Sequence, residues 1–491
     1  MSKAGLIIIF VGLVLRLYKV DLPLLEFYPS RQIQTAEIAR NFYKYELPIT
    51  RPVVSYIGPS LTPFLVEFPG YNFAIAFIYR MIGSSDETVG RIFSIVGWLI
   101  SCYFLFQIAK KYVGDLGAKV ALFFYTFSPL SILVSRSFQP DQWMVTFSLT
   151  AIYFLVRSGK TWYFWLSAIF ASLSILLKLP AAVFTLIPIY FLMMNVRQKS
   201  GVFRIMSYSV IAIAPSITWY FYVVLINRSQ GLLGTATQIS NWFGPEVFLN
   251  PKYWSNLFGF EMNLVLLPVG MVLFLIGVIT KLKNGRQFLY FWLGSVVLYF
   301  LIFNKHNMTH EYYHLPFLPI AAIFFGIGAN RVIEKIDGLA LPKNLLILVF
   351  STLIFMMMLP PTLARAYKPI ERFSHVIATG EEIQKLTKPT DLIIGSMDAG
   401  PALVYYSDRY GWGFDVERDQ IAPDLIFYGV RNPSVSTAVQ ELEKLRSKGA
   451  VIFASAYKIQ FLENKEFSTY MYKNFPVIYE TDKTIIFGLS R

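Results

Sequence analysis

The chain has 491 residues, of which 55% are hydrophobic and only 15% are charged, and its formal net charge is +14. A soluble globular protein has about a quarter charged residues, so this composition excludes an ordinary soluble domain. The basic residues lie mainly in short segments between long apolar runs, which is typical of membrane orientation and not of nucleic-acid binding. The single cysteine, Cys102, excludes an intramolecular disulfide.

The apolar runs predict a mainly α, polytopic transmembrane helical bundle embedded in the lipid bilayer. The first run has a basic start but no small-residue cleavage site after it, so it predicts a retained span and not a signal peptide. We expect eleven spans, at about 4–20, 89–109, 116–134, 141–157, 161–178, 180–196, 204–226, 263–280, 287–303, 314–330 and 344–361.

The apolar segment 68–82 decides the topology, because it is only some fifteen residues long and contains Arg80. If it lies on the outer surface as a juxtamembrane helix, the basic clusters of the later short loops face the cytoplasm, as the positive-inside rule requires. We therefore expect a multi-pass protein of the cell's inner (plasma) membrane with a cytoplasmic N-terminus. The segments expected on the outer face are 21–88, 135–140, 227–262, 304–313 and everything after Pro361.

The C-terminal part has ordinary polarity and predicts a small extracytoplasmic α/β domain at 366–491, after a transmembrane domain at 1–365. Residues 439–449 have an amphipathic pattern that predicts a helix ending at Gly449. Short apolar segments predict buried strands at 391–396, 449–455, 476–480 and 484–489.

The first outer loop, 21–88, is unusually polar for this chain and is the candidate catalytic platform. Glu67 lies just before the apolar segment 68–82. A carboxylate held near the bilayer is a natural general base, because partial desolvation raises the pKa of a carboxyl group towards neutrality. The alternative is an exposed glutamate in a hydrated loop, which is common.

Three further ionisable residues lie at predicted outer ends of spans. Asp141 follows Pro140 and is expected either to cap the next helix or to face a substrate. Arg136 is expected to pair with Asp141 or to bind a substrate phosphate. Lys178 lies at another outer boundary, where the alternative is a side chain that extends to the membrane surface.

Residues 310–314 match the HExxH pattern of zinc proteases, in which two histidines four residues apart hold a metal. Asp337, the expected third ligand, lies 23 residues beyond His314, or about 35 Å along a helix, and cannot reach the same ion. We therefore expect no metal site. The cationic cluster of Lys305, His306, His310 and His314 is expected to bind a phosphate group or, alternatively, lipid headgroups.

Five short motifs follow one another along the first 360 residues or so. They are Arg-Gln-x-Gln-Thr-Ala at 31–36 followed by Ile38-Ala39-Arg40, Glu67-Phe68-Pro69 with Tyr71, Gly83 with Glu87 and Arg91, Ser135-Arg136 with Pro140-Asp141, and His310-Glu311-Tyr312-Tyr313 with Pro316 and Pro319. In this order they resemble the bacterial members of the protein mannosyltransferase and aminoarabinose transferase superfamily, which are glycosyltransferases of the GT-C membrane fold.

The resemblance implies transfer of a sugar from a polyprenyl-phosphate carrier to a lipid, glycan or protein acceptor on the outer face, by inverting attack and without a metal or other cofactor. It also implies an acidic base in the first outer loop. Many relatives have an Asp-Glu pair just before the juxtamembrane helix, whereas this chain has Ser30, Arg31 and Gln32. Glu67 is therefore the expected base, with Glu26 behind it.

In the resulting hypothesis, cationic side chains stabilise the charge that develops on the carrier phosphate, Glu67 deprotonates the acceptor, and Asp141 helps to hold the sugar or the acceptor. The substrate-binding candidates are Glu26, Arg31, Gln32, Gln34, Arg136, Lys178, Lys305, His306, His310, Tyr313 and His314. The alternatives are a flippase or transporter of lipid-linked sugars, and an inactive acceptor-binding scaffold. A transporter favours ionisable residues at mid-span and repeated halves, and this sequence has neither feature.

Overall fold

The computed structural model describes residues 2–157, 160–195, 202–229, 242–281, 286–336, 343–396, 398–414 and 438–489. The chain packs into two compact units, which we describe separately. The first comprises Met1–Val20, Arg91–Phe221 and Ile239–Tyr367, and the second comprises Asp21–Gly90, Tyr222–Gln238 and Lys368–Arg491. The second unit thus joins the first outer loop to the C-terminal residues, and the predicted domain boundary at 365/366 stays a prediction.

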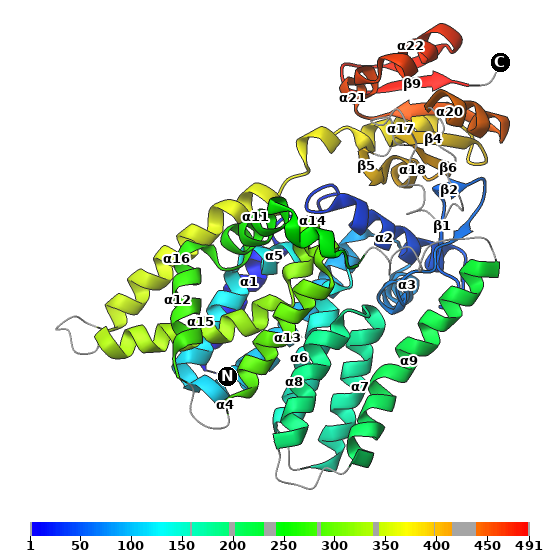
Figure 1. Cartoon of the computed structure of the whole chain (residues 1–491). Helices are drawn as coiled ribbons and strands as arrows, with labels where there is room; N and C mark the ends of the chain where they lie inside the picture. The colour runs from blue at the N-terminus through cyan, green and yellow to red at the C-terminus, as the bar shows by residue number, and fades with distance from the viewer. Residues whose placement is uncertain are drawn as a thin grey trace. The chain divides into compact units, whose positions relative to one another are not determined.

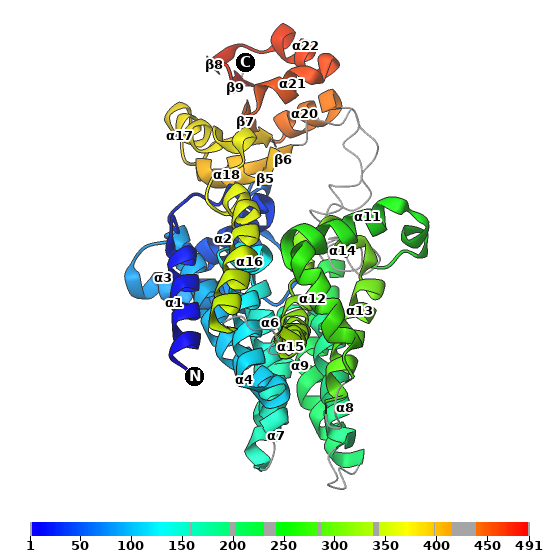
Figure 2. The ribbon, with the colours of Figure 1, turned by 90° about the vertical axis from the view of Figure 1, so that its left-hand side faces the viewer.

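The first unit is built of helices, labelled in Figure 1 and turned in Figure 2. Their bounds are α1 Lys3–Leu17, α4 Glu87–Phe127, α5 Pro129–Ser135, α6 Asp141–Arg157, α7 Thr161–Leu177, α8 Ala181–Asn195, α9 Val202–Ser229, η1 Pro245–Leu249, α11 Pro251–Phe260, η2 Glu261–Val265, α12 Leu267–Ile279, α13 Phe288–Ile302, α14 Asn304–Thr309, η3 Glu311–His314, α15 Phe317–Ile336 and α16 Lys343–Ala366. Each predicted apolar run coincides with one or more of these helices.

The predicted spans 89–109 and 116–134 differ most from the structure. Helix α4 passes through the predicted loop between them, and a single residue, Gly114, is non-helical there, with φ 78° and ψ 179°. Glycine reaches this backbone conformation without steric cost, so one residue is enough to kink the helix. The second span is itself divided before Pro129, because proline has no backbone N–H with which to continue a helix.

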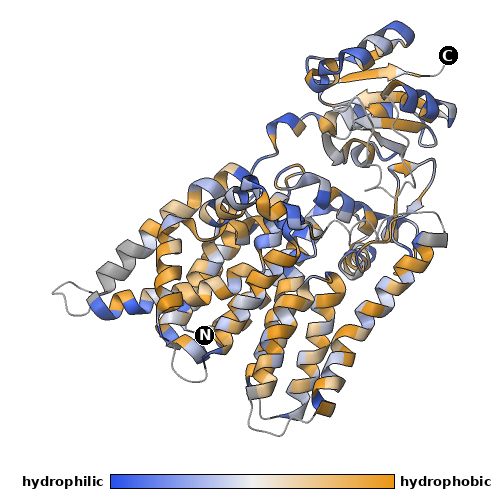
Figure 3. Ribbon diagram, viewed as in Figure 1, coloured by the Kyte–Doolittle hydropathy of each residue, from blue (hydrophilic) through white to orange (hydrophobic). Residues whose placement is uncertain are grey.

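Three of the described helices are long and apolar enough to cross a membrane: Glu87–Phe127, Val202–Asn227 and Phe317–Lys335. A fourth candidate is the pair Pro251–Val265 and Leu267–Ile279, which is bent by 99°. Apolar residues dominate the helices of the first unit, as the orange ribbon in Figure 3 shows. Three further apolar helices, Thr161–Leu177, Ala181–Met194 and Phe288–Ile302, are shorter than a full span. The count of eleven spans therefore stays a prediction.

Glycine lets helices α12 and α15 of the first unit cross in direct backbone contact. A Cβ atom added at Gly277 would lie 1.9 Å from the carbonyl oxygen of Phe324, and one added at Gly328 would lie 1.9 Å from that of Leu273. Small residues at such crossings are typical of helix pairs in membranes, where close packing takes the place of the hydrophobic effect. This crossing fixes α15, whose N-terminal end follows the histidine-rich segment directly.

Arg16, in the last turn of α1, is fully buried within the same unit. Its guanidinium donates hydrogen bonds to the hydroxyl groups of Ser135 (2.7 Å) and Ser131 (2.9 Å). It also lies 3.6 Å from the ring centroid of Trp98. A buried charge without such partners would cost several kcal/mol, so these contacts join α1 firmly to α5.

The second unit combines helices with short strands. Its helices are α2 Pro29–Lys44, α3 Gly70–Ile82, η4 Glu371–Phe373, α17 Val376–Leu386, α18 Ala402–Ser407, α20 Ala438–Ser447, α21 Lys458–Glu463 and α22 Lys465–Asn474. Its strands are β1 Val53–Val54, β2 Ile57–Gly58, β3 Thr62–Pro63, β4 Leu392–Ser396, β5 Asp398–Pro401, β6 Tyr410–Phe414, β7 Ala450–Ser455, β8 Val477–Glu480 and β9 Ile485–Gly488. The four predicted strands, the predicted helix before Gly449 and the predicted helix at 68–82 are all confirmed as elements. The predicted burial of the strand at 476–480 is wrong, because β8 lies at the edge of the sheet and is mostly exposed.

A six-stranded sheet of order β2-β6-β4-β7-β9-β8 is the core of this unit. Strand β4 is parallel to β6 and β7, whereas the other pairings are antiparallel. Helix α17 covers one face of the sheet and α20 the other (Figure 2). The edge strand β2 comes from the first outer loop, and its Ile57 pairs with Trp412 of β6. The first outer loop and the C-terminal residues therefore share one sheet.

The glycine crossing makes a direct prediction. Gly328→Ala is expected to lower the thermal unfolding temperature of the purified full-length protein in detergent, because the added methyl group forces α12 away from α15, and such overpacking costs about 1–3 kcal/mol. Gly294→Ala in α13 is the control, since a Cβ atom there meets no atom within 4 Å. Equal unfolding temperatures for the two variants would contradict the close crossing.

Candidate functional site

The predicted base, Glu67, belongs to a polar network in the second unit. Its carboxylate accepts a hydrogen bond from the guanidinium of Arg31. Arg31 also donates to Oε1 of Gln34 (2.7 Å), one turn further along α2, and Gln34 donates to the hydroxyl of Tyr56 (3.2 Å). The structure thus brings together three of the predicted residues, and it adds Tyr56, which the sequence analysis missed.

The ion pair with Arg31 fixes the position of the Glu67 side chain. Charge-assisted hydrogen bonds are short and strong, so the Glu67 carboxylate keeps a fixed orientation. The side chains of Arg31 and Glu67 are 19% and 24% exposed, so neither is sealed inside the unit. Glu67 is therefore partly open to solvent, and its role as base remains a prediction.

Two other candidates in this loop, Gln32 and Glu26, are buried. The Gln32 side chain donates to the carbonyl oxygen of Phe27 (2.6 Å), which ties the start of α2 to the chain before it. Glu26 is only 3% exposed. These positions favour a structural part for both residues, and their roles in substrate binding stay predictions.

The same helix carries a buried carboxylate that the sequence analysis did not single out. Glu37 is fully buried, and its Oε1 accepts from the backbone N–H (2.8 Å) and the hydroxyl of Ser55. Its Oε2 is buried and has no hydrogen-bond partner among the described residues. Burial raises the pKa of Glu37, although Arg40 and Ser55 act in the opposite direction. The small apolar neighbours Ala36 and Ala39 were the one hint of this burial.

In the first unit, Asp141 and Lys178 form a buried ion pair. Lys178 Nζ lies 2.7 Å from Oδ1 of Asp141, and the two side chains are 4% and 2% exposed. Asp141 is the first residue of α6 and Lys178 caps the C-terminal end of α7, so each charge has the sign that its helix end favours. Oδ2 of Asp141 is buried without a hydrogen-bond partner among the described residues, and it can accept a hydrogen bond from a ligand.

Aromatic rings surround this ion pair. The ammonium of Lys178 lies 5.0 Å from the ring centroid of Tyr312 and 4.9 Å from that of Tyr313, within the range of cation–π attraction. The Tyr313 ring in turn contacts the imidazoles of His306 (5.2 Å) and His310 (5.8 Å). We call Asp141, Lys178, Tyr312, Tyr313, His306 and His310 the Lys178 cluster. Its ammonium, imidazole and phenol groups are donors that suit a phosphate group.

Arg136 is placed differently from these residues. Its guanidinium donates to the backbone carbonyl oxygens of Arg16 (2.7 Å), Tyr18 and Lys19 (3.0 Å), and so caps the C-terminal end of α1. Arg136 is buried, with 2% of the residue exposed. This arrangement holds two helices together, and the phosphate-binding role of Arg136 stays a prediction.

Lys305 and His314 also have acidic partners in the first unit. Lys305 Nζ lies 3.1 Å from Glu246, in a largely exposed pair. The buried His314 lies between the Glu261 carboxylate (2.7 Å) and the carbonyl oxygen of Asn307 (3.0 Å). The predicted cationic cluster is thus divided, and the structure brings His306 and His310 to the ring of Tyr313, which faces the Lys178 ammonium.

The HExxH pattern does not lie on an α-helix. His310 is extended, with φ −124° and ψ 104°, and residues 311–314 form a 3₁₀ turn. Within the described ranges, no group of three or more His, Cys, Asp or Glu side chains could hold a metal ion. Asp337 lies outside the described residues. A zinc protease needs both histidines on one helical face, so this geometry argues against that alternative.

The sequence model of a family described as dolichyl-phosphate-mannose-protein mannosyltransferase matches residues 63–219, which is less than half of the chain. No curated protein matches the sequence. Among solved structures, ArnT from Cupriavidus metallidurans bound to undecaprenyl phosphate is similar with a TM-score of 0.67 at 13% identity, over 100% of this chain and 99% of that chain.

Two other membrane enzymes are similar over the whole chain. The archaeal oligosaccharyltransferase AglB from Archaeoglobus fulgidus, in complex with an inhibitory peptide and a dolichol-phosphate, has a TM-score of 0.59 at 11% identity, with 74% of its own chain covered. The arabinofuranosyltransferase AftD from Mycobacteria has a TM-score of 0.58 at 11% identity, with 40% of its chain covered. Identities this low show the fold, which is the GT-C fold that the motifs predicted.

The buried ion pair predicts strongly unequal effects of single and double substitution. Lys178→Met is expected to destabilise the protein by about 3–5 kcal/mol, because it leaves the Asp141 carboxylate buried without its counter-charge. The double variant Asp141→Leu/Lys178→Met should recover most of this loss. Unfolding of the purified protein in detergent measures both effects.

Lys305→Met is the matched control, since it removes a lysine from an exposed pair. Surface pairs contribute little to stability, so this variant should unfold almost like the parent. A Lys178→Met protein as stable as Lys305→Met would contradict the buried pair.

Glu37 predicts a pH dependence of stability. Burial raises the pKa of Glu37 above the ordinary value of 4.5. Between pH 4.5 and the raised pKa, the folded protein therefore holds a proton that the unfolded chain has already released. Stability therefore falls as the pH rises through this window. Glu37→Gln should reduce this loss of stability. The unfolding temperature of the variant should therefore rise relative to that of the parent protein as the pH increases above 4.5. Glu46→Gln, exposed just after α2, should follow the parent at every pH.

Proposed function

We propose that this protein is an integral membrane glycosyltransferase that moves a sugar from a polyprenyl-phosphate carrier to an acceptor on the outer face of the membrane. The observation that carries the proposal is the full-length likeness to ArnT, whose structure holds undecaprenyl phosphate. The mannosyltransferase family match is independent support, because it rests on sequence and covers both the end of the first outer loop and the segment with Asp141 and Lys178.

The Lys178 cluster supplies the donor side of the proposed reaction. Breaking the bond between the sugar and the carrier leaves negative charge on the phosphate, and fixed ammonium and imidazole groups stabilise that charge. The Asp141 carboxylate holds Lys178 in place through its Oδ1. Its second oxygen is available to a hydroxyl group of the donor sugar, which gives Asp141 the substrate-holding role that the sequence predicts.

Glu67 supplies the acceptor side. It takes the proton from the acceptor hydroxyl while the hydroxyl oxygen attacks the anomeric carbon, and the carrier phosphate leaves with the electrons of the broken bond. Arg31 positions the Glu67 carboxylate throughout. The proton then passes from Glu67 to solvent, so the carboxylate is restored without any redox partner.

The proposed reaction takes place at the plasma membrane with the C-terminal residues on the outer side, and its acceptor is a lipid, a glycan or a protein. The sugar is a hexose or a pentose. A flippase of lipid-linked sugars is the second candidate, and it differs in one respect: it never breaks the bond between sugar and carrier.

The test uses purified protein in detergent, polyprenyl-phosphate sugars with a label in the sugar, and a membrane extract as acceptor pool. Label should leave the carrier and appear on an acceptor, and a chelator should not change the rate. Glu67→Gln is expected to lower the rate by about 10²–10⁴-fold, because a general base contributes that much.

Glu46→Gln, an exposed change in the same loop, controls for nonspecific effects and should keep full activity. Transfer that survives Glu67→Gln would overturn the assignment of the base and would direct attention to Glu26 or Asp141. Label that crosses the membrane of a reconstituted vesicle while still attached to its carrier would establish the flippase instead.

A further inference from the structure

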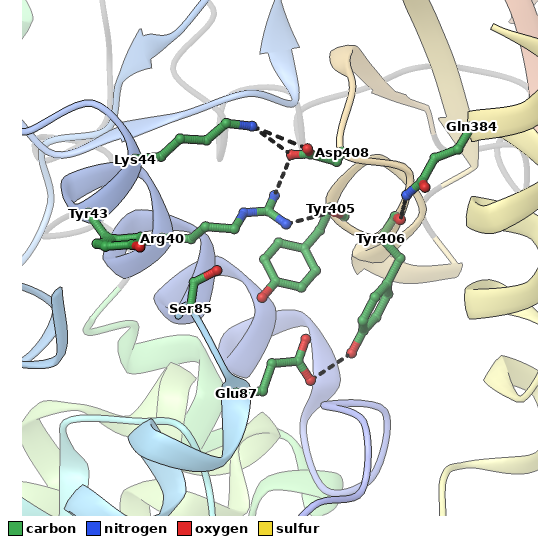
Figure 4. Close-up of a pocket in the computed structure, with 9 residues that line it drawn as sticks. All are labelled: Arg40, Tyr43, Lys44, Ser85, Glu87, Gln384, Tyr405, Tyr406 and Asp408. Atoms are coloured by element: carbon green, nitrogen blue, oxygen red, sulfur yellow. Dashed lines mark hydrogen bonds and ion pairs between the residues drawn. The ribbon is translucent and has the colours of Figure 1, made fainter. Parts of the chain in front are cut away.

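A cavity of about 400 Å³ lies within the second unit, apart from the residues assigned above (Figure 4). Helix α2, the start of α4, and helices α17 and α18 contribute its walls. The lining residues are Arg40, Tyr43, Lys44, Ser85, Glu87, Gln384, Tyr405, Tyr406 and Asp408. Small-molecule sites usually have volumes of about 300–1,000 Å³, so the cavity has room for a ligand of one or two rings.

The charges that line the cavity balance one another. Lys44 Nζ lies 3.2 Å from both carboxylate oxygens of Asp408, and a terminal nitrogen of Arg40 lies 3.9 Å from the same carboxylate. The hydroxyl of Tyr406 donates to Glu87 (3.2 Å). Two cations thus face two carboxylates, and the cavity has no net charge with which to select a phosphate or an ammonium ligand.

Aromatic rings in fixed positions form part of the wall. The guanidinium of Arg40 stacks 4.0 Å from the centroid of Tyr405 and donates to the Tyr405 carbonyl oxygen (3.1 Å). Tyr406 meets Tyr405 edge-on, with centroids 5.0 Å apart. Tyr43, on the α2 side, packs against Tyr79 of α3 at 5.9 Å. These contacts hold the rings in place before a ligand arrives, which lowers the entropic cost of binding.

Hydrogen-bonding groups of both kinds remain open to a ligand. The side chains of Lys44 and Asp408 are 44% and 50% exposed. Gln384 is exposed on α17, where its amide N–H donates to the carbonyl oxygen of Tyr406 (3.0 Å), so its amide oxygen is the group that can accept from a ligand. Ammonium and amide N–H groups donate, whereas carboxylate and amide oxygens accept. A ligand that matches this wall needs no charge, many groups that both donate and accept, and a flat apolar face for the rings. A saccharide has all three properties.

We propose that this cavity is a saccharide subsite that holds a neutral sugar unit of the acceptor. The assignment to the acceptor rests on the proposed function, whereas the assignment to a neutral saccharide rests on the cavity itself. A sugar unit held there by Lys44, Gln384 and Asp408 orients a glycan or glycolipid acceptor and selects it from other hydroxyl-bearing molecules.

The test measures binding without any donor. Methyl glycosides of glucose, galactose, mannose and N-acetylglucosamine are titrated into the full-length protein in detergent and followed by saturation-transfer NMR. At least one glycoside should bind, and added inorganic phosphate should not displace it. Gln384→Ala and Asp408→Asn should each weaken that binding about tenfold, since each removes a ligand hydrogen bond.

One control variant and one further measurement on Asp408→Asn make the result specific. Glu381→Ala changes an exposed residue of the same helix, α17, that does not line the cavity, and it should bind glycosides like the parent. Asp408→Asn removes the partner of Lys44, so the variant should gain phosphate binding as it loses glycoside binding. Unfolding temperatures verify that each variant is folded.

Each outcome decides a different claim. Failure of all four glycosides to bind, or binding that is equal in Gln384→Ala and Glu381→Ala, would overturn the saccharide subsite. Displacement of the glycoside by phosphate would make the cavity an anion site. A protein that binds glycosides but releases no sugar from a carrier keeps the subsite and loses the proposed function. In an active enzyme, Gln384→Ala should raise the acceptor KM and leave kcat unchanged.

Discussion

The cost of removing charge from water shapes both units of this protein. A single buried ion in apolar surroundings costs several kcal/mol, and a partner of opposite sign offsets most of that cost. In the first unit, Lys178 and Asp141 meet this requirement at 2.7 Å. Arg16 meets it with hydroxyl groups and stacking on Trp98. Because each charge needs its partner, the ends of α1, α6 and α7 are fixed. Tyr312 and Tyr313 contact the fixed Lys178 ammonium, and the two histidines contact Tyr313.

Helix α2 has the corresponding place in the second unit. It carries Arg31 and Gln34, which hold the Glu67 carboxylate, and also Arg40 and Lys44, which line the saccharide cavity. The pairing of β2 with β6 then connects the first outer loop to the C-terminal sheet by backbone hydrogen bonds. A shift of α2 would therefore alter the base and the cavity together, which gives the C-terminal residues a physical route to influence the chemistry.

Local sequence patterns were sufficient to predict the long apolar helices and four of the strands. The span at 141–157 coincides with α6, because Pro140 and Asp141 define its start, and the strand at 484–489 contains β9. Local patterns were insufficient where a contact with a distant segment of the chain determines a strand or the partner of a side chain. Strand β2 has only two residues and exists through its pairing with β6. The partner of Asp141 is Lys178, 37 residues away, whereas the sequence offered the nearer Arg136. Only its small apolar neighbours hinted at the burial of Glu37, and nothing local marked Tyr405 as a cavity wall.

The two groups of residues differ in chemistry: the Lys178 cluster combines a buried ion pair with two imidazoles, whereas the cavity of the second unit is lined by partly exposed charges. The leaving group of the proposed reaction is an anion, and its stabilisation needs donors whose positive charge is held in place. The Lys178 cluster offers an ammonium with two imidazoles. The acceptor is a neutral hydroxyl compound, and a strongly charged site would favour competing ions over it. The cavity of the second unit balances Arg40 and Lys44 with Glu87 and Asp408. A flippase has no need of this division, because the lipid-linked sugar is its only ligand. A second ligand site of different chemistry therefore favours a transferase, and transfer of the labelled sugar to an acceptor is the measurement that bears on it most directly.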